Sequence, residues 1–343
     1  MKFVVNKAWS SGCRVGAVEM GSCPGPIETP ALLLSTRKGL PHFISPDLLT
    51  SLPSPDSHLL QISPLHFLEG LASTTISKIG GLHQMLGLHQ YGIIAVARDS
   101  IQCLPESKGA TKFGASFETP CGRLLAAGSI FGAIVGGSNL DERKRCAKEV
   151  AKRNVSGYWI GGFGLGESIH ERSALLSAII DVLPGEKPRM ISGLGLPEEI
   201  LQGIDAGIDL FDSTYIYSLT LGGFALTFSL DKNGNQYNFQ QSQTGSDMTK
   251  INLRAKVYRK DMSPILGNCS CYTCLNHSKA YINHLFNVHE MLAQILLEIH
   301  NTHHYLMFFH VIREAIKDGR FEKFRQTFIE SRRAHHEREA VCA

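Results

Sequence analysis

Three cysteines near the C-terminal end of the chain are spaced for metal binding. The run C-S-C-Y-T-C, residues 269–274, places Cys269, Cys271 and Cys274 in a C-x-C-x2-C pattern. Structural zinc sites use four thiolate or imidazole ligands arranged as a tetrahedron. The sequence therefore predicts a closed, structural zinc site for which this run supplies three ligands. The alternative is a loop with three unligated thiols.

The fourth ligand must come from another part of the chain. The segment after the cluster offers several imidazoles, and spacing alone does not choose among them: His277, His284, His289 and His300.

The segment from 278 to 300 has the pattern of one long amphipathic helix. Apolar side chains recur there every three or four residues, at Tyr281, Leu285, Val288, Leu292, Ile295 and Ile299. Two further helical stretches are expected to follow, up to about residue 333. Upstream of the cluster, residues 231–250 are polar and predict a loop.

The middle of the chain alternates between strand-like and helix-like segments. Apolar runs at 129–137, 155–162, 188–193 and 208–212 are separated by helical patterns at 140–153, 167–183 and 196–207. This alternation is typical of βαβ units around a parallel sheet. The glycines of G-G-F-G-L-G, residues 161–166, do not fit G-x-G-x-x-G, which disfavours a dinucleotide-binding fold.

Composition is that of an ordinary globular protein. The chain has 343 residues, 43% of them hydrophobic and 19% charged, so it can bury a core in one large or two smaller domains. A formal net charge of +3 is too small to indicate nucleic-acid binding by itself.

The cysteines favour a reducing, intracellular setting. Their number, nine, is odd, and the first ten residues hold an apolar run of only three residues, which is too short for a signal peptide. No stretch approaches the roughly 18 apolar residues of a membrane span. Clustered thiols in such a setting indicate a metal more than disulfides.

Several motifs together resemble the tRNA-guanine transglycosylase family. C-S-C-Y-T-C, H-S-K-A-Y-I-N-H-L and E-I-H-N resemble the zinc-binding end of that family. Five upstream segments resemble other parts of it, in the same order: 28–49, 78–88, 130–137, 157–167 and 207–213.

The resemblance implies an α/β fold, a (β/α)8 TIM-type barrel with an inserted zinc-binding subdomain. The barrel and its N-terminal segment would occupy residues 1–230, the polar loop 231–250, the zinc subdomain and C-terminal helices 251–333, and a frayed tail 334–343. It also implies that His300, followed by Asn301, is the fourth zinc ligand. Members of the family exchange guanine at the wobble position of tRNA anticodons for queuine or a precursor.

The family's catalytic positions can be assigned by motif. Asp212, which ends I-D-L-F-D, matches the nucleophile that attacks the ribose, and Asp99 in R-D-S-I-Q matches a second aspartate. The backbone of Gly162 and Phe163 matches the loop that faces the incoming base. Such groups are expected at the C-terminal ends of barrel strands.

The chain departs from the family's pattern at several places. Residues 213–223, S-T-Y-I-Y-S-L-T-L-G-G, lack the proline and arginines that follow the nucleophile in catalytic members. The D-S-G-G-x-Q motif is reduced to D-S-I-Q, and Val135 replaces a base-reading glutamine. Between 113–125 and 128–137 there is no room for the βα unit that the family places there, which predicts either a barrel that lacks one unit or a shortened form of the chain.

These departures favour a non-catalytic accessory subunit that pairs with a catalytic homologue in a heterodimer. It would act on tRNA, carry one Zn²⁺ and lack a transmembrane segment. The resemblance places such subunits in the cytoplasm, peripheral to the mitochondrial outer membrane. One alternative is a catalytic enzyme with Asp212 as nucleophile. Another is a zinc-stabilised RNA-binding module that uses the basic residues of 250–260, a stretch more often found as a solvated strand face.

Overall fold

The computed structural model describes residues 1–9, 12–63, 66, 78–96, 131–164, 167–230 and 249–330. These residues form two compact units. Unit 1 comprises Met1–His42 and Pro55–Thr214, and unit 2 comprises Phe43–Ser54 and the chain from Tyr215 onward. The domain bounds expected from the resemblance stay a prediction.

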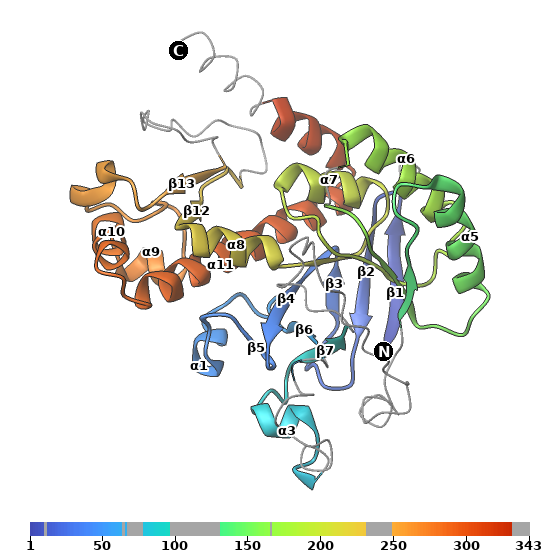
Figure 1. The fold of residues 1–343 in the computed structure, drawn as a ribbon, viewed down its shortest axis with the longest axis horizontal. Helices are drawn as coiled ribbons and strands as arrows, with labels where there is room; N and C mark the ends of the chain where they lie inside the picture. Colours follow the sequence, from blue (N-terminus) through green and yellow to red (C-terminus); the bar gives the residue numbers. More distant parts are fainter. Residues whose placement is uncertain are drawn as a thin grey trace, which may run out of the picture. The chain divides into compact units, whose positions relative to one another are not determined.

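Unit 1 is built around a curled parallel sheet (Figure 1). Its strands lie in the order β7-β6-β4-β11-β10-β9-β8, and each neighbouring pair is parallel. The bounds are β4 (Ala31–Arg37), β6 (Leu59–Ile62), β7 (Gly92–Ala95), β8 (Phe131–Ile134), β9 (Gly157–Ile160), β10 (Arg189–Ile191) and β11 (Leu210–Asp212). A short strand, β5 (Leu40–Pro41), turns back antiparallel on β4.

The first and last parallel strands of unit 1 are neighbours. Leu32 of β4 pairs with Phe211 of β11, as in a barrel that closes on itself. The expected α/β, TIM-type architecture is therefore confirmed. Strands β7 and β8 are the two ends of the described order, and residues 97–130, which connect them, lie outside the described residues. The predicted loss of one βα unit therefore stays a prediction.

The helices between these strands begin where the sequence supplies caps. They are α5 (Leu140–Ala151), α6 (Ile169–Ile180) and α7 (Pro197–Asp205). Figure 1 shows these three helices one after another around the outside of unit 1. Asn139 accepts a hydrogen bond from the backbone of Glu142, and Ser168 and Glu171 form a capping box. The predicted alternation of strands and helices is confirmed. A shorter helix, α3 (Leu82–Leu86), precedes β7.

An antiparallel sheet, β1 (Lys2–Ala8), β2 (Arg14–Glu19) and β3 (Ile27–Thr29), completes unit 1. Arg14 of β2 donates two hydrogen bonds, of 2.8 and 2.6 Å, to the buried carboxylate of Asp209. Asp209 immediately precedes β11 and also accepts the backbone N–H of Arg189. This pair therefore ties the N-terminal sheet to the N-terminal ends of the parallel strands.

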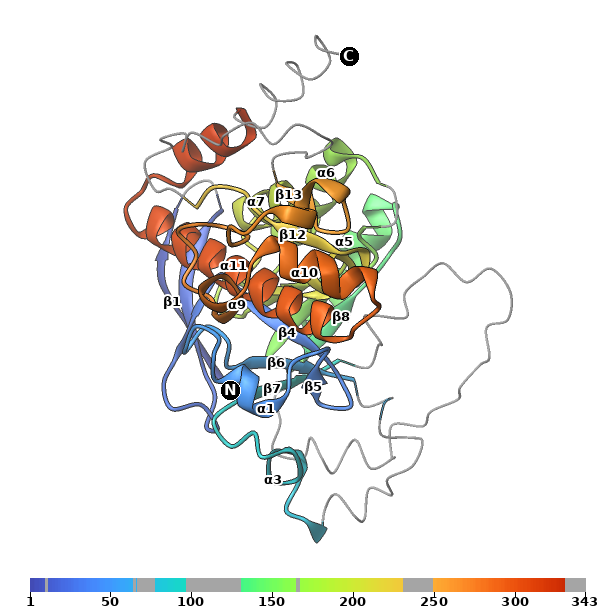
Figure 2. The same ribbon diagram turned by 90° about the vertical axis from the view of Figure 1, so that its left-hand side faces the viewer.

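Unit 2 contains the cysteine cluster. Figure 2 labels the elements of this part of the chain, among them α9, α10 and α11. The hairpin β12–β13 and the helices α9 and α10 all pack near the long helix α11. The bounds are α1 (Pro46–Leu49), α8 (Thr214–Gly222), β12 (Phe224–Leu226), β13 (Lys250–Asn252), the 3-10 helix η2 (Lys256–Lys260), α9 (Tyr272–Asn276), α10 (Lys279–Asn287) and α11 (Leu292–Lys317). Residues 321–330 are also helical.

The prediction of one helix over 278–300 was wrong, because the helix breaks after Asn287. His289 adopts a left-handed φ of 59°. The Glu290 N–H donates to the Leu285 carbonyl at 2.9 Å and the His289 N–H to the Phe286 carbonyl, which is the Schellman pattern of a helix end. A new helix, α11, then runs on past His300.

The basic stretch 250–260 is not a continuous strand either. It is the short strand β13 followed by a turn and η2. None of the helices that the structure describes is long and apolar enough to cross a membrane.

Candidate functional site

The cysteine run and α11 meet in unit 2. Cys269 lies in the loop before α9, and Cys271 caps that helix, where its sulfur accepts the N–H of Cys274 at 3.3 Å. This tight turn points the thiols toward the same place. Helix α11 brings His300 to the thiols from a position 26 to 31 residues along the chain.

The four side chains have the dimensions of a tetrahedral metal site. The Nδ1 atom of His300 lies 3.8 Å from Cys269 Sγ, 3.6 Å from Cys271 Sγ and 3.3 Å from Cys274 Sγ. All four ligand atoms lie within 4.8 Å of one another. Zinc bonds of about 2.3 Å to sulfur and about 2.0–2.1 Å to nitrogen correspond to S···N edges of about 3.6 Å. The group could therefore hold a metal ion.

The protein also orients the imidazole of this group. His300 Nε2 lies 2.8 Å from the carbonyl oxygen of Leu226, so Nε2 carries the proton and donates it, and Nδ1 keeps a lone pair for a metal. The neighbouring Asn301 fixes the same strand. Its Oδ1 accepts the Leu226 N–H at 2.9 Å, and its Nδ2 donates to the Phe224 carbonyl at 2.9 Å.

Electrostatics at the cluster favour a cation. Hydrogen bonds with Cys271 and Cys274 hold the pKa of the Cys269 thiol well below its ordinary value. Burial lowers the pKa of His300, but its hydrogen bonds with Cys269 and Cys271 outweigh burial and raise that pKa to about 9. Hydrogen bonds with Cys269 and Cys271 raise the pKa of the Cys274 thiol, so the cluster resists a further negative charge unless a cation is bound.

The structure chooses among the histidines that spacing left open. Within the described part of the chain, the group that could hold a metal ion comprises Cys269, Cys271, Cys274 and His300. His277 instead stacks on Tyr281, with ring centroids 5.3 Å apart. Sequence reasoning missed His303, whose Nδ1 lies 3.8 Å from Cys269 Sγ. A helical spacing of three residues from His300 was the available signal for it.

In unit 1, Asp212 ends β11 at the C-terminal mouth of the sheet. Its carboxylate is 4% exposed and accepts the N–H of Gly193 at 3.3 Å and of Thr214 at 3.1 Å. Burial raises the pKa of this carboxyl, although hydrogen bonds from Thr214, Ser192 and Gly193 act to lower it. Asp99, the second expected aspartate, lies outside the described residues.

Gly162 and Phe163 lie in the loop after β9, and a buried arginine holds both of them. Arg143 donates to the carbonyl oxygens of Gly161 at 3.0 Å and Gly162 at 2.9 Å, and its guanidinium stands 4.3 Å from the centre of the Phe163 ring. It also donates to Gly137, in the loop after β8. Sequence reasoning missed Arg143, because its position on a charged helix resembles that of a surface residue.

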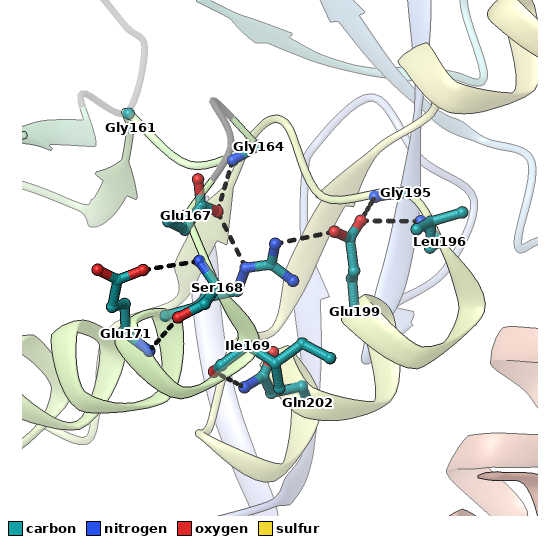
Figure 3. A network of polar contacts seen from close by, with 12 residues as sticks. Gly161, Gly164, Glu167, Ser168, Ile169, Glu171, Gly195, Leu196, Glu199 and Gln202 are labelled. Atoms are coloured by element: carbon teal, nitrogen blue, oxygen red, sulfur yellow. Dashed lines mark hydrogen bonds and ion pairs between the residues drawn. The ribbon is translucent and has the colours of Figure 1, made fainter. Parts of the chain in front are cut away.

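The loops that follow β9 and β10, at the C-terminal end of the parallel sheet, are connected through two glutamates and an arginine between them (Figure 3). Glu167 accepts the Gly164 N–H at 2.8 Å, and Glu199 accepts the N–H groups of Gly195 and Leu196. Arg172 of α6 bridges the two carboxylates, at 3.0 Å from Glu167 and 2.9 Å from Glu199. The backbones of these loops touch, since a Cβ on Gly164 would collide with the carbonyl of Gly193.

Comparison with known proteins agrees with this architecture. Residues 123–334 match the family model described as queuine tRNA-ribosyltransferase. The queuine tRNA-ribosyltransferase accessory subunit 2 of Pongo abelii is 36% identical over 299 residues, which cover 75% of this chain and 70% of that protein. The accessory subunit 2 of Homo sapiens is 40% identical over 226 residues, 59% of this chain and 54% of that protein.

A bacterial protein is also similar. The queuine tRNA-ribosyltransferase of Desulforapulum autotrophicum is 32% identical over 241 residues, 70% of this chain and 59% of that protein. The chain thus spans little more than half the length of several of the curated relatives that it matches. With matching motifs, a curled parallel sheet and a Cys3His centre in the expected order, the chain belongs to the queuine tRNA-ribosyltransferase family.

Proposed function

We propose that the chain is a non-catalytic accessory subunit of a queuine tRNA-ribosyltransferase. It supports the exchange of guanine for queuine at the wobble position, 34, of tRNA anticodons by a catalytic partner. The observation that carries this proposal is helix α8, which begins two residues after Asp212. Its sequence, T-Y-I-Y-S-L-T-L-G, contains no basic residue that could hold anticodon phosphates over the carboxylate.

The surroundings of Asp212 support the same conclusion. A nucleophilic carboxylate must approach a ribose carbon, whereas this one is buried and accepts backbone hydrogen bonds from its own and a neighbouring loop. Val135, which replaces the base-reading glutamine, is 50% exposed and offers no hydrogen bond from its side chain. The relatives named accessory subunit 2 support this assignment further.

The metal is Zn²⁺. Three thiolates and one imidazole at tetrahedral spacing are the ligands that structural zinc prefers, and four protein ligands leave no open position for a substrate. Zinc at this centre supplies folding energy by joining α9 to α11. Thiolate ligands also suit the reducing cytoplasm, where the accessory role places the chain as a peripheral protein of the mitochondrial outer membrane.

The surface of unit 2 around the metal centre is the docking face for the catalytic partner. Two large apolar side chains that line one hollow there are strongly exposed, Met262 by 77% and Leu275 by 69%. Met291, just before α11, is 63% exposed. A surface cavity of about 530 Å³ lies among Met262, Leu275, His277 and Tyr281. Apolar patches of this kind mark protein interfaces, and a homologous subunit fits the pseudo-two-fold pairing of related chains.

Basic residues of η2 supply contacts to tRNA phosphates. Lys256, Arg259 and Lys260 are all exposed and lie within five residues of one another. Phosphate contacts position an RNA without carrying chemistry, which is what an accessory subunit contributes.

Coexpression with a catalytic homologue, followed by light scattering and a labelled-guanine exchange assay, tests the proposal. We expect the two chains to elute together at micromolar concentration, and we expect exchange to require the partner. Leu275→Asp should separate the chains, whereas Ile169→Asp, an exposed apolar residue of unit 1, should not.

Two results would overturn this assignment. Exchange by the isolated chain that Asp212→Asn abolishes would make the chain the catalytic enzyme. Separate elution combined with tight tRNA binding by the isolated chain would make it an RNA-binding module.

A further inference from the structure

The four residues of the metal centre are not equally protected. Cys271, Cys274 and His300 are buried, whereas Cys269 is partly exposed. Three thiolates and a neutral imidazole around a divalent cation carry a net charge of about −1. This excess charge resides on the sulfurs, and its burial is favourable only where hydrogen-bond donors reach them.

One sulfur has a backbone donor. The Cys274 N–H points at Cys271 Sγ at 3.3 Å. Near Cys269 the corresponding polar group is the ring of His303, whose Nδ1 lies 3.8 Å from Sγ, within range of a hydrogen bond to sulfur. His303 is 8% exposed, so protein and not solvent holds its ring in place.

The second ring nitrogen of His303 indicates where the proton lies. Its Nε2 is 3.5 Å from the hydroxyl of Ser270, which can donate to a ring nitrogen that lacks a proton. A thiolate cannot donate, so the nitrogen that faces Cys269 must do so. Both contacts are satisfied together when Nδ1 carries the proton and Nε2 accepts from Ser270.

We propose that His303 is a positioning residue of the metal centre, which donates a hydrogen bond from Nδ1–H to the Cys269 thiolate and is itself oriented by Ser270. This inference rests on the proposal that the centre binds zinc and not on the accessory role. This hydrogen bond withdraws negative charge from Cys269 Sγ, the sulfur that water can reach, and fixes the orientation of that side chain. The thiolate of Cys269 is then a weaker base, and the metal leaves more slowly.

The test uses the full chain loaded with Co²⁺ in place of zinc, with three variants. His303→Leu removes the donor, His303→Asn replaces it with an amide donor, and His310→Leu makes the same change at a partly exposed histidine of α11. We expect His303→Leu to shift the sulfur-to-cobalt charge-transfer band to longer wavelength. Transfer of the metal to a competing chelator should become about tenfold faster, within the range typical of lost outer-shell contacts.

The ligand-field bands should keep their tetrahedral intensity in every variant, because the four ligands remain. His303→Asn should restore most of the wild-type band position and transfer rate, and His310→Leu should match wild type. Wild-type behaviour of His303→Leu would overturn the proposal. So would a change of its ligand-field bands, because His303 would then be a ligand itself.

A measurement on the unaltered chain covers the case in which His303→Leu fails to fold. Nitrogen-15 chemical shifts of the zinc-loaded protein report which ring nitrogen of each histidine carries a proton. We expect Nδ1 of His303 to be protonated and Nε2 not. An unprotonated Nδ1 overturns the proposal. Failure of the chain to bind Zn²⁺ or Co²⁺ at all would instead refute the zinc assignment.

Discussion

At the scale of single residues, the candidate metal site contains two kinds of group: the ligands themselves and the residues that orient them. Cys269, Cys271 and Cys274 could be recognised from spacing alone, because a C-x-C-x2-C run needs little tertiary structure to converge. His300 could not, since spacing left four candidate histidines open between residues 277 and 300 and only the family resemblance selected one. The structure brings His300 to the thiols because α11 places it beside Leu226.

Removal of one thiol should destabilise unit 2. We expect Cys271→Ser to lower the free energy of unfolding by on the order of 4 kcal/mol, as for other losses of a structural metal, and to abolish stoichiometric zinc. Thermal unfolding and elemental analysis measure both quantities. His277→Ala, which leaves the ligands intact, should retain its zinc and most of its stability. Equal zinc content in the two variants would show that the site is wrongly assigned.

Asp212 should make stability depend on pH in a predictable direction. Burial raises its pKa in the folded chain above the unfolded value. The folded state therefore binds this proton more tightly, so the contribution is fully present below the unfolded pKa, near 4, and is lost as pH rises through the folded pKa.

The variant Asp212→Asn cannot ionise and should lack this loss. Urea unfolding of both proteins from pH 4 to pH 7 measures the difference in unfolding free energy, which should shift in favour of the variant as pH rises. A difference that stays constant, or that shifts toward wild type, would show that the carboxylate is not destabilised by burial.

At the scale of elements, the sequence predicted short strands and helices with marked ends correctly, whereas it failed for the long apolar pattern over 278–300. Strands β8 to β11 and helices α5 to α7 lie within the predicted ranges, because glycines and caps mark their ends. The break between α10 and α11 was missed, since apolar spacing continues across it. Val288 and Leu292 belong to that pattern, yet they are 49% and 38% exposed. Apolar spacing alone therefore does not show whether a helix face is buried in the core or exposed for docking.

The helix break offers a test of backbone strain. His289 occupies the left-handed position of the Schellman turn, where glycine avoids a Cβ clash. We expect His289→Gly to stabilise the chain by about 0.5–1 kcal/mol, measured by urea unfolding. The matched change His284→Gly, at an exposed position inside α10, should destabilise it by about 0.5–1 kcal/mol. Destabilisation by both variants would show that His289 makes contacts that outweigh its strain.

The loops at the barrel mouth should depend on Arg172. Its replacement by methionine removes the cation that two mostly buried carboxylates share, which costs about 3–5 kcal/mol. We expect Arg172→Met to accelerate hydrogen exchange of the Gly164, Gly195 and Leu196 amides together. Arg145→Met, which breaks an exposed pair with Glu142, should have little effect on stability and leave those amides unchanged. Faster exchange in only one loop would show that the loops are not coupled.

At the scale of the whole molecule, the proposed contact with tRNA depends on where the exposed basic residues lie. We expect the double variant Lys256→Glu, Arg259→Glu to weaken tRNA binding by the assembled pair. The dependence of log affinity on log salt should become shallower by about 1–2 units, because phosphate contacts release fewer counterions. Filter binding at several salt concentrations measures this slope.

A matched control makes the same charge change on unit 1. Lys148→Glu with Arg153→Glu alters two exposed basic residues of that unit and should leave the slope unchanged. Light scattering should show an intact pair for both double variants. An equal loss of affinity in both would mean that net charge, and not the η2 surface, governs binding.

The pairing of β4 with β11 has a consequence for synthesis on the ribosome. The Ser35 N–H donates to Ser213 Oγ across 178 residues, and Arg14 reaches Asp209 across 195. At about 5–20 residues per second, β4 emerges roughly 10–35 seconds before its partner strand exists. Throughout that interval one edge of β4 is unpaired and can join the wrong strand. We therefore expect the nascent chain to be exposed to aggregation until β11 has been translated, because its sheet depends on contacts between residues far apart in sequence.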